Sequence, residues 1–330
     1  MSVDEGRDII PFDEAARRQR PERSRQADIS HFFTWHDGLP YPQWDLVRAW
    51  AESRRDAETR RRVWIDAGRQ WLIELASALG AAYDLGESEH FMAVACGAAA
   101  DESLLAFAER CRARLMSSLG DVVRFQVPGK QIVIVLGRSD DYYRYIAAYY
   151  ADGEHGGSGG VHIRQGYPHV ALLATRRWKP EGTLAHELTH VALHHCSMPQ
   201  WLEEGLACLF ECDMAGSRQL EVNAAMAAEH EAYWGREGLD AFWRGEGFSR
   251  PTEVQGLSYQ LAQILARLLI DDSQPRWFGL VREPQRRFFA FLREASQEDC
   301  GEEACRKHLG YGIADLAARF LGPGAWAPSL

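Results

Sequence analysis

The sequence predicts an α+β fold: a small mixed β-sheet with helices, followed by a mainly α-helical C-terminal half. Short apolar runs rich in β-branched residues occur in the first half of the chain, and 130–136 is the clearest of them. Beyond residue 180 nearly every segment repeats its apolar residues at helical spacing. Strands that precede a run of helices are typical of α+β proteins.

The pattern also predicts where these elements lie. Apolar runs bounded by glycine indicate strands, and longer amphipathic segments indicate helices. The glycine-rich stretch 153–160 is expected to be a flexible loop. Strands are expected at 89–96, 130–136, 161–164 and 169–174. Helices are expected at 101–118 and 140–150, and then at 218–234, 252–270, 276–295, 302–309 and 313–320.

Three parts are expected along the chain. Residues 1–28 mix charged residues, Gln and Pro with few apolar ones, which indicates a disordered tail. Residues 29–86 are expected to form an N-terminal helical segment, whose apolar stripe favours packing as a structural layer. Covering a cleft and recruiting a partner are the alternatives for that segment. Residues 87–330 are expected to form the main domain, with a β-containing lobe to about 178 and a helical lobe at 179–330.

Composition narrows the functional classes. The 330 residues are 46% hydrophobic and 25% charged, as in globular proteins. A net charge of -10 gives no electrostatic support for a nucleic-acid partner. The sequence shows neither a signal peptide nor an apolar stretch that could span a membrane, so we expect a cytoplasmic protein with no membrane partner. Seven cysteines without paired spacing are consistent with reduced thiols.

The chemistry-bearing motif is H-E-x-x-H at 186–190. On a helix, His186 and His190 lie one turn apart on the same face, about 6 Å from each other. Two imidazoles at that distance can bind one zinc ion, and Glu187 then lies beside the open coordination position. The alternative is a helix with two incidental histidines, so a third ligand decides the question.

His194 continues the same helical stripe, but it lies about 12 Å along the axis from His186 and cannot share an ion with it. A third histidine brought back by a turn would require a glycine break, and residues 191–195 contain none. The next predicted helix offers Glu204, 14 residues after His190, with Gly205 beside it. We expect Gly205 to let this helix approach the first one closely. Two histidines and one glutamate leave a zinc position open for water.

With these motifs in view, the sequence resembles a known family. H-E-x-x-H followed by W-L-E-E-G-L-A at 201–207 is similar to the gluzincin signature of aminopeptidase-N relatives, and most similar to short peptidase-MA-like domains. The resemblance covers about 87–321. It implies a zincin-like fold, a Zn2+ cofactor and a peptide or protein substrate. It also implies that Glu204, rather than Glu203, is the third ligand, and that Glu211 is an acidic residue supporting a ligand.

The resemblance also suggests roles in catalysis. Glu187 is expected to be the general base. Tyr259 is our choice for the residue that stabilises the oxyanion, because related domains carry a similarly placed tyrosine; His230 and Tyr233 are weaker candidates, and a tyrosine packed in the core is an equally good interpretation of Tyr259. The strands at 130–136 or 169–174 are expected to pair with an extended substrate at a sheet edge.

One departure bears on specificity. Aminopeptidase-N enzymes carry a G-x-M-E-N segment whose glutamate holds the substrate's amino group, whereas 161–175 contains no glutamate. An endopeptidase therefore fits better than an aminopeptidase. Two further hypotheses stay open: a catalytically silent relative that binds or regulates, and a metal hydrolase with a non-peptide substrate. The presence of Glu187 argues against the silent form, because a structural metal needs no general base.

Overall fold

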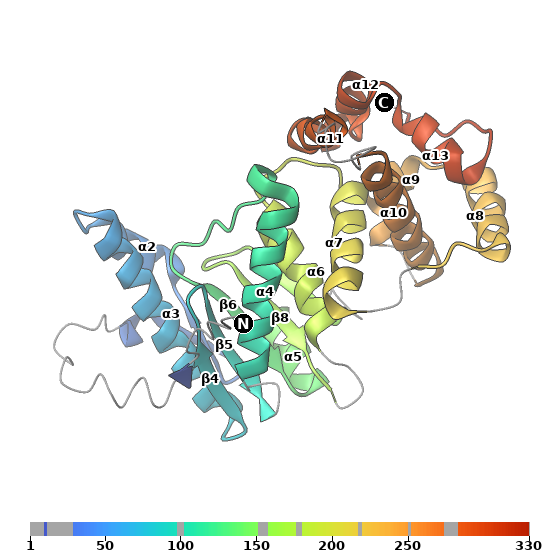
Figure 1. Cartoon of the computed structure of the whole chain (residues 1–330). Coiled ribbons are helices and arrows are strands. Elements are labelled where there is room, and N and C mark those ends of the chain that lie inside the picture. The colour runs from blue at the N-terminus through green and yellow to red at the C-terminus, as the bar shows by residue number, and fades with distance from the viewer. Residues whose placement is uncertain are drawn as a thin grey trace, which may run out of the picture. The chain divides into compact units, whose positions relative to one another are not determined.

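The computed structural model describes most of the chain. It covers residues 10–11, 29–97, 102–150, 158–175, 180–216, 220–249, 252–273 and 283–329. The predicted tail therefore lies outside the described residues except for 10–11, and the predicted loop except for 158–160. Two compact units are formed, one by the residues up to Arg114 with Phe125–Leu188, the other by Leu115–Arg124 with Thr189–Leu330. The fold is α+β with a helical C-terminal half, as predicted (Figure 1).

A six-stranded mixed sheet organises the first unit. Its order is β1-β4-β5-β6-β8-β7; β5, β6 and β8 run parallel, and the other neighbours pair antiparallel. The strands are β1 (Ile10–Pro11), β4 (Tyr83–Glu87), β5 (Phe91–Cys96), β6 (Gln131–Leu136), β7 (Gly160–Ile163) and β8 (His169–Leu173). All four predicted strands are present.

The expectation that 130–136 or 169–174 pairs with a substrate is wrong, because β6 and β8 each have a strand on both sides. Among the described strands the terminal one at that side is β7.

One face of this sheet is covered by α2 (Trp44–Glu52), α3 (Ala57–Leu79) and α5 (Ser139–Ala147). Their buried side chains join alternate residues of the strands, such as Ile132 and Ile134, in a single core cluster. Figure 1 shows α3 alongside β4 and β5. Residues 29–86 therefore pack as a layer on the sheet. They are helical over α2 and α3, and they also supply β4 and a hairpin of β2 (Phe33–His36) and β3 (Leu39–Pro42).

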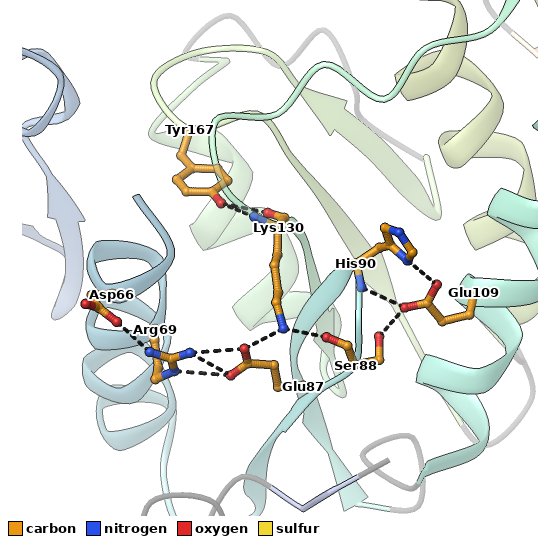
Figure 2. Close-up of polar contacts among 8 residues, drawn as sticks. All are labelled: Asp66, Arg69, Glu87, Ser88, His90, Glu109, Lys130 and Tyr167. Carbon is orange, nitrogen blue, oxygen red and sulfur yellow. Dashed lines mark hydrogen bonds and ion pairs between the residues drawn. The ribbon is translucent and has the colours of Figure 1, made fainter. Parts of the chain in front are cut away.

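Ion pairs at one end of the sheet connect α3 to the strands (Figure 2). Glu87, the last residue of β4, accepts two hydrogen bonds from Arg69 Nη2 and lies 2.6 Å from Lys130 Nζ. Burial raises the pKa of Glu87, but the bonds and charges of Arg69 and Lys130 lower it further, and the net effect is a lowered pKa. In the same network Glu109 of α4 (Glu102–Leu119) accepts from Ser88 and from the His90 backbone. These contacts fix the turn between β4 and β5.

The second unit is built from helices. They are α7 (Gln200–Ala215), α8 (Ala224–Glu237), α9 (Asp240–Trp243), α10 (Thr252–Ser273), α11 (Glu283–Glu294), α12 (Glu302–Leu309) and α13 (Ile313–Leu321). The most extensive packing in this unit is between α7 and α10 (Figure 1). Trp201 anchors the start of α7 by donating its indole N–H to the Cys300 carbonyl. Within the described residues, no helix combines the length and apolar composition needed to cross a bilayer.

Gly205 permits the packing of α7 on α10. A Cβ atom at this position would lie 2.4 Å from the Ala262 carbonyl oxygen and 2.8 Å from Ala266 Cβ. The sequence-based expectation was that Gly205 lets α7 approach the helix that carries the histidines, and this is wrong: the nearest atoms to that position all belong to α10. Gly205 therefore allows close packing between α7 and α10.

Candidate metal centre

The predicted motif lies on α6 (Pro180–Leu193), a continuous helix. Proline suits the first turn, where its missing N–H leaves no bond unmade. Leu184, Leu188 and Ala192 are fully buried and hold one side of the helix in the core. His186 and His190 are half-buried on the other side, and the Glu187 side chain is buried. Because both histidines belong to one helix, their spacing follows from helical geometry alone.

The structure brings the predicted ligands together. One nitrogen each from His186 and His190 and one carboxylate oxygen of Glu204 lie within 4.8 Å of one another, and among the described residues this is the group that could hold a metal ion. Glu204 is buried on α7. Its Oε2 lies 3.5 Å from His190 Nε2, which is longer than an ordinary hydrogen bond. Two ligands of a tetrahedral zinc ion, with bonds of about 2.1 Å, lie about 3.4 Å apart. The separation between Glu204 Oε2 and His190 Nε2 is therefore that of two ligands of one metal ion.

Glu203 is a site residue that the sequence interpretation missed. Its Oε1 lies 2.8 Å from Nδ1 of His190, and both side chains are about 15% exposed. A carboxylate at Nδ1 accepts a hydrogen bond, so a ring proton belongs on Nδ1, and Nε2 is the ring nitrogen nearest to Glu204. A carboxylate in this position orients a ligand histidine and raises its basicity. The Glu203-Glu204 doublet was the available signal, but the resemblance assigned only one of its two carboxylates.

The general-base candidate lies against the terminal strand of the sheet. A Cβ atom on Gly160 of β7 would lie 3.2 Å from Cγ of Glu187, and 2.5 Å from Cγ2 of Thr183, one turn earlier on α6. Only a residue without a side chain fits this approach of the β7 backbone to α6. Glu187 is thus positioned on one side by its own helix and on the other by the main chain of β7.

The oxyanion candidates differ in their surroundings. Tyr259 lies half-buried on α10, with its ring edge-to-face against Phe248 at 5.2 Å between centroids. His230 is fully buried on α8, where its Nε2 contacts Gln260 and its Nδ1 accepts from Trp234. Burial lowers the pKa of His230, so this ring is neutral and bonded at both nitrogens. Its bonds are those of a core histidine. Tyr233 packs edge-to-face on its neighbour Trp234.

Comparisons with known proteins do not assign this chain to a family. The chain matches no protein-family model and no curated protein sequence. The resemblance to gluzincins therefore stays a prediction.

Proposed function

We propose that this protein is a zinc-dependent peptidase, and more specifically an endopeptidase. One observation carries the proposal: two imidazole nitrogens one helical turn apart and the Glu204 carboxylate are within 4.8 Å of one another, with Glu187 next to the first histidine. Two histidines and a carboxylate form a ligand set of hydrolytic rather than structural zinc sites, because one position stays open. Cytoplasmic location stays a prediction, supported by the seven free thiols.

The residues of the chain would divide the work as follows. His186, His190 and Glu204 would hold the ion, which when bound supplies a Lewis acid for the scissile carbonyl and for water. Glu187 would take the proton of the attacking water and deliver it to the leaving amine. Its side chain is buried and lies against the Gly160 backbone, which would hold the carboxylate in place for that transfer. Glu203 would keep the His190 ring in the orientation and tautomer that a ligand needs.

The outer edge of β7 is where an extended substrate would bind. Strand β7 ends the described sheet, and its first residue, Gly160, lies against Glu187. A peptide that adds to this edge would receive main-chain hydrogen bonds and pass close to the general base. None of the four β7 residues is acidic, so the strand offers no carboxylate for a free amino terminus. This favours cleavage within a chain over removal of its first residue.

The direct test compares wild type with Glu187→Gln on a library of peptides derived from a whole proteome. We expect wild type with zinc bound to cleave peptides at internal bonds, and the variant to bind zinc equally well but cleave at least about 100-fold more slowly, because general acid–base catalysis contributes about that much. Zinc binding without cleavage by wild type would instead favour the silent binding protein. Cleavage unchanged in the variant would remove Glu187 from the mechanism.

A metal hydrolase with a non-peptide substrate remains the second candidate. It uses the same ligands and the same general base, so zinc content cannot separate the two. The β7 edge can, because main-chain pairing recognises a polypeptide and nothing else. A wild-type enzyme that hydrolyses small esters or amides but no peptide in the library would decide for this candidate.

A further inference from the structure

A buried tyrosine is bonded to the segment that leads into β7. Tyr142 of α5 is fully buried, and its hydroxyl lies 3.0 Å from the Oγ atom of Ser158. Burial raises the pKa of Tyr142, the hydrogen bond with Ser158 lowers it, and the net effect is a raised pKa. The hydroxyl is therefore neutral.

The segment after Ser158 is fixed at each residue. The Gly159 carbonyl accepts from the Leu173 backbone N–H at 2.9 Å, and Gly160 pairs with Leu172. On the other side Gly160 is in close contact with Glu187. Ser158 is the residue before these constraints begin, and its hydroxyl is in hydrogen-bond contact with that of Tyr142.

We infer that Tyr142 and Ser158 form a latch that fixes the start of β7 beside Glu187, and so positions an extended peptide on the outer edge of that strand. The inference depends on the proposed peptidase function for its substrate. Tyr142 is a positioning residue and not a catalytic one, because its buried hydroxyl acts through Ser158 and the β7 backbone. The latch supplies what a peptide needs at this edge: main-chain donors and acceptors held in place before binding.

The ring and the hydroxyl of Tyr142 have separable roles. The ring belongs to the core cluster that also contains Val161 and Ile163 of β7, and phenylalanine would fill the same volume. The hydroxyl alone reaches Ser158. Since Ser158 is half-buried, its hydroxyl can turn to water when the partner is removed. Tyr142→Phe is therefore expected to fold and to release only the latch.

The test uses the zinc-loaded full-length protein with Tyr142→Phe, Ser158→Ala and the double variant, and Tyr143→Phe, an exposed neighbour, as control. We expect each latch variant to lower kcat/KM for an extended peptide about two- to tenfold through KM, as the loss of one hydrogen bond allows, with kcat and zinc content unchanged. The double variant should lose no more than either single one. The control should match wild type.

A second readout does not depend on activity. Amide hydrogen exchange of residues 159–163 should become about two- to tenfold faster in both latch variants, because the bond that holds the strand start is lost. Unchanged exchange in β7, or single-variant effects that add in the double variant, would overturn the latch. If wild type cleaved no peptide but β7 exchange still increased, the proposed function would fail while the latch remained.

Discussion

His190 of α6 and Glu203 of α7 are joined by a contact of 2.8 Å between Nδ1 and Oε1. This contact directs the other ring nitrogen of His190 towards Glu204, and it connects the two ligand helices through a group that is not itself a ligand. In the proposed site, Glu203 would orient the ring of His190 and the adjacent Glu204 would bind the metal ion.

Removing the orienting carboxylate should weaken metal binding. We expect Glu203→Ala to lower zinc affinity about 10- to 100-fold, the usual cost of losing such a partner, and Glu203→Gln to lower it less because the amide oxygen still accepts. Competition with a chromogenic chelator measures the affinity. Glu211→Ala is the matched comparison on the same helix, since the resemblance gave that residue the supporting role. A larger loss in Glu211→Ala than in Glu203→Ala would reverse our assignment.

Adding one methyl group to Gly205 should separate α7 from α10. The new Cβ of Gly205→Ala would lie 2.4 Å from the Ala262 carbonyl oxygen, so one helix must move. We expect the free energy of unfolding to fall by about 1–3 kcal/mol, as overpacking does. Gly256→Ala on α10 is the control, because nothing lies within 4 Å of its Cβ position and a helical alanine should be neutral or up to about 1 kcal/mol stabilising. Equal effects in urea unfolding would contradict the packing role.

His169 should make the protein less stable at acidic pH. Its ring is fully buried, with Nδ1 2.7 Å from the Tyr167 carbonyl and Nε2 2.7 Å from the Tyr145 hydroxyl. Burial lowers the pKa of His169 from 6.5 to about 4. Since the unfolded state binds the proton more readily, the neutral ring contributes stability that is complete above the unfolded pKa and is lost as pH falls towards 4.

The difference between the unfolded pKa of 6.5 and the folded pKa of about 4 sets the size of this effect. Below both pKa values, the free energy of unfolding is lower by roughly 3 kcal/mol than at neutral pH. We expect urea unfolding of wild type to lose about 2–3 kcal/mol more than His169→Gln between about pH 7 and about pH 4.5. The two proteins are compared by how steeply the free energy of unfolding changes with pH, because the substitution itself lowers stability at every pH. Parallel pH profiles for the two proteins would show that His169 does not titrate in this way.

Breaking the ion-pair network at the end of the sheet should cost more than breaking an exposed pair. Glu87 is 17% exposed, and it contacts both Arg69 and Lys130. We expect Glu87→Gln to lower the free energy of unfolding by about 1–3 kcal/mol, because Lys130 loses its carboxylate partner and Arg69 keeps only Asp66. Glu58→Gln, which breaks the exposed pair with Arg62, should cost under about 0.5 kcal/mol. Similar losses in the two variants would mean that the network contributes little.

The sequence predicted the elements whose signal is local. The clearest was β6, because its run of β-branched residues is typical of a buried strand, and all six of its residues are buried. The hairpin β2–β3 was missed although its turn, Asp37-Gly38, is a favoured hairpin pair with both φ angles positive. The prolines of β3 and the few apolar residues of β4 obscured two strands that exist through pairing with their neighbours.

In the candidate site, too, the residues with a local sequence signal were predicted and the contacts between separate segments were not. His186, Glu187 and His190 follow from one helical turn, and Glu204 followed from the doublet and the resemblance. The contact of Glu203 with His190, the packing of Gly205 on α10 and the position of β7 beside Glu187 depend on how separate segments fold together. No spacing along the chain contains that information.

X-ray absorption at the zinc edge of the purified protein tests the central claim most directly. We predict one zinc ion per chain, bound by two imidazole nitrogens and by oxygen at about 2.0–2.1 Å, with no sulfur ligand, and a loss of most bound zinc in Glu204→Ala. A spectrum with sulfur at about 2.3 Å, or full zinc content in Glu204→Ala with unchanged coordination, would contradict the site built from His186, His190 and Glu204.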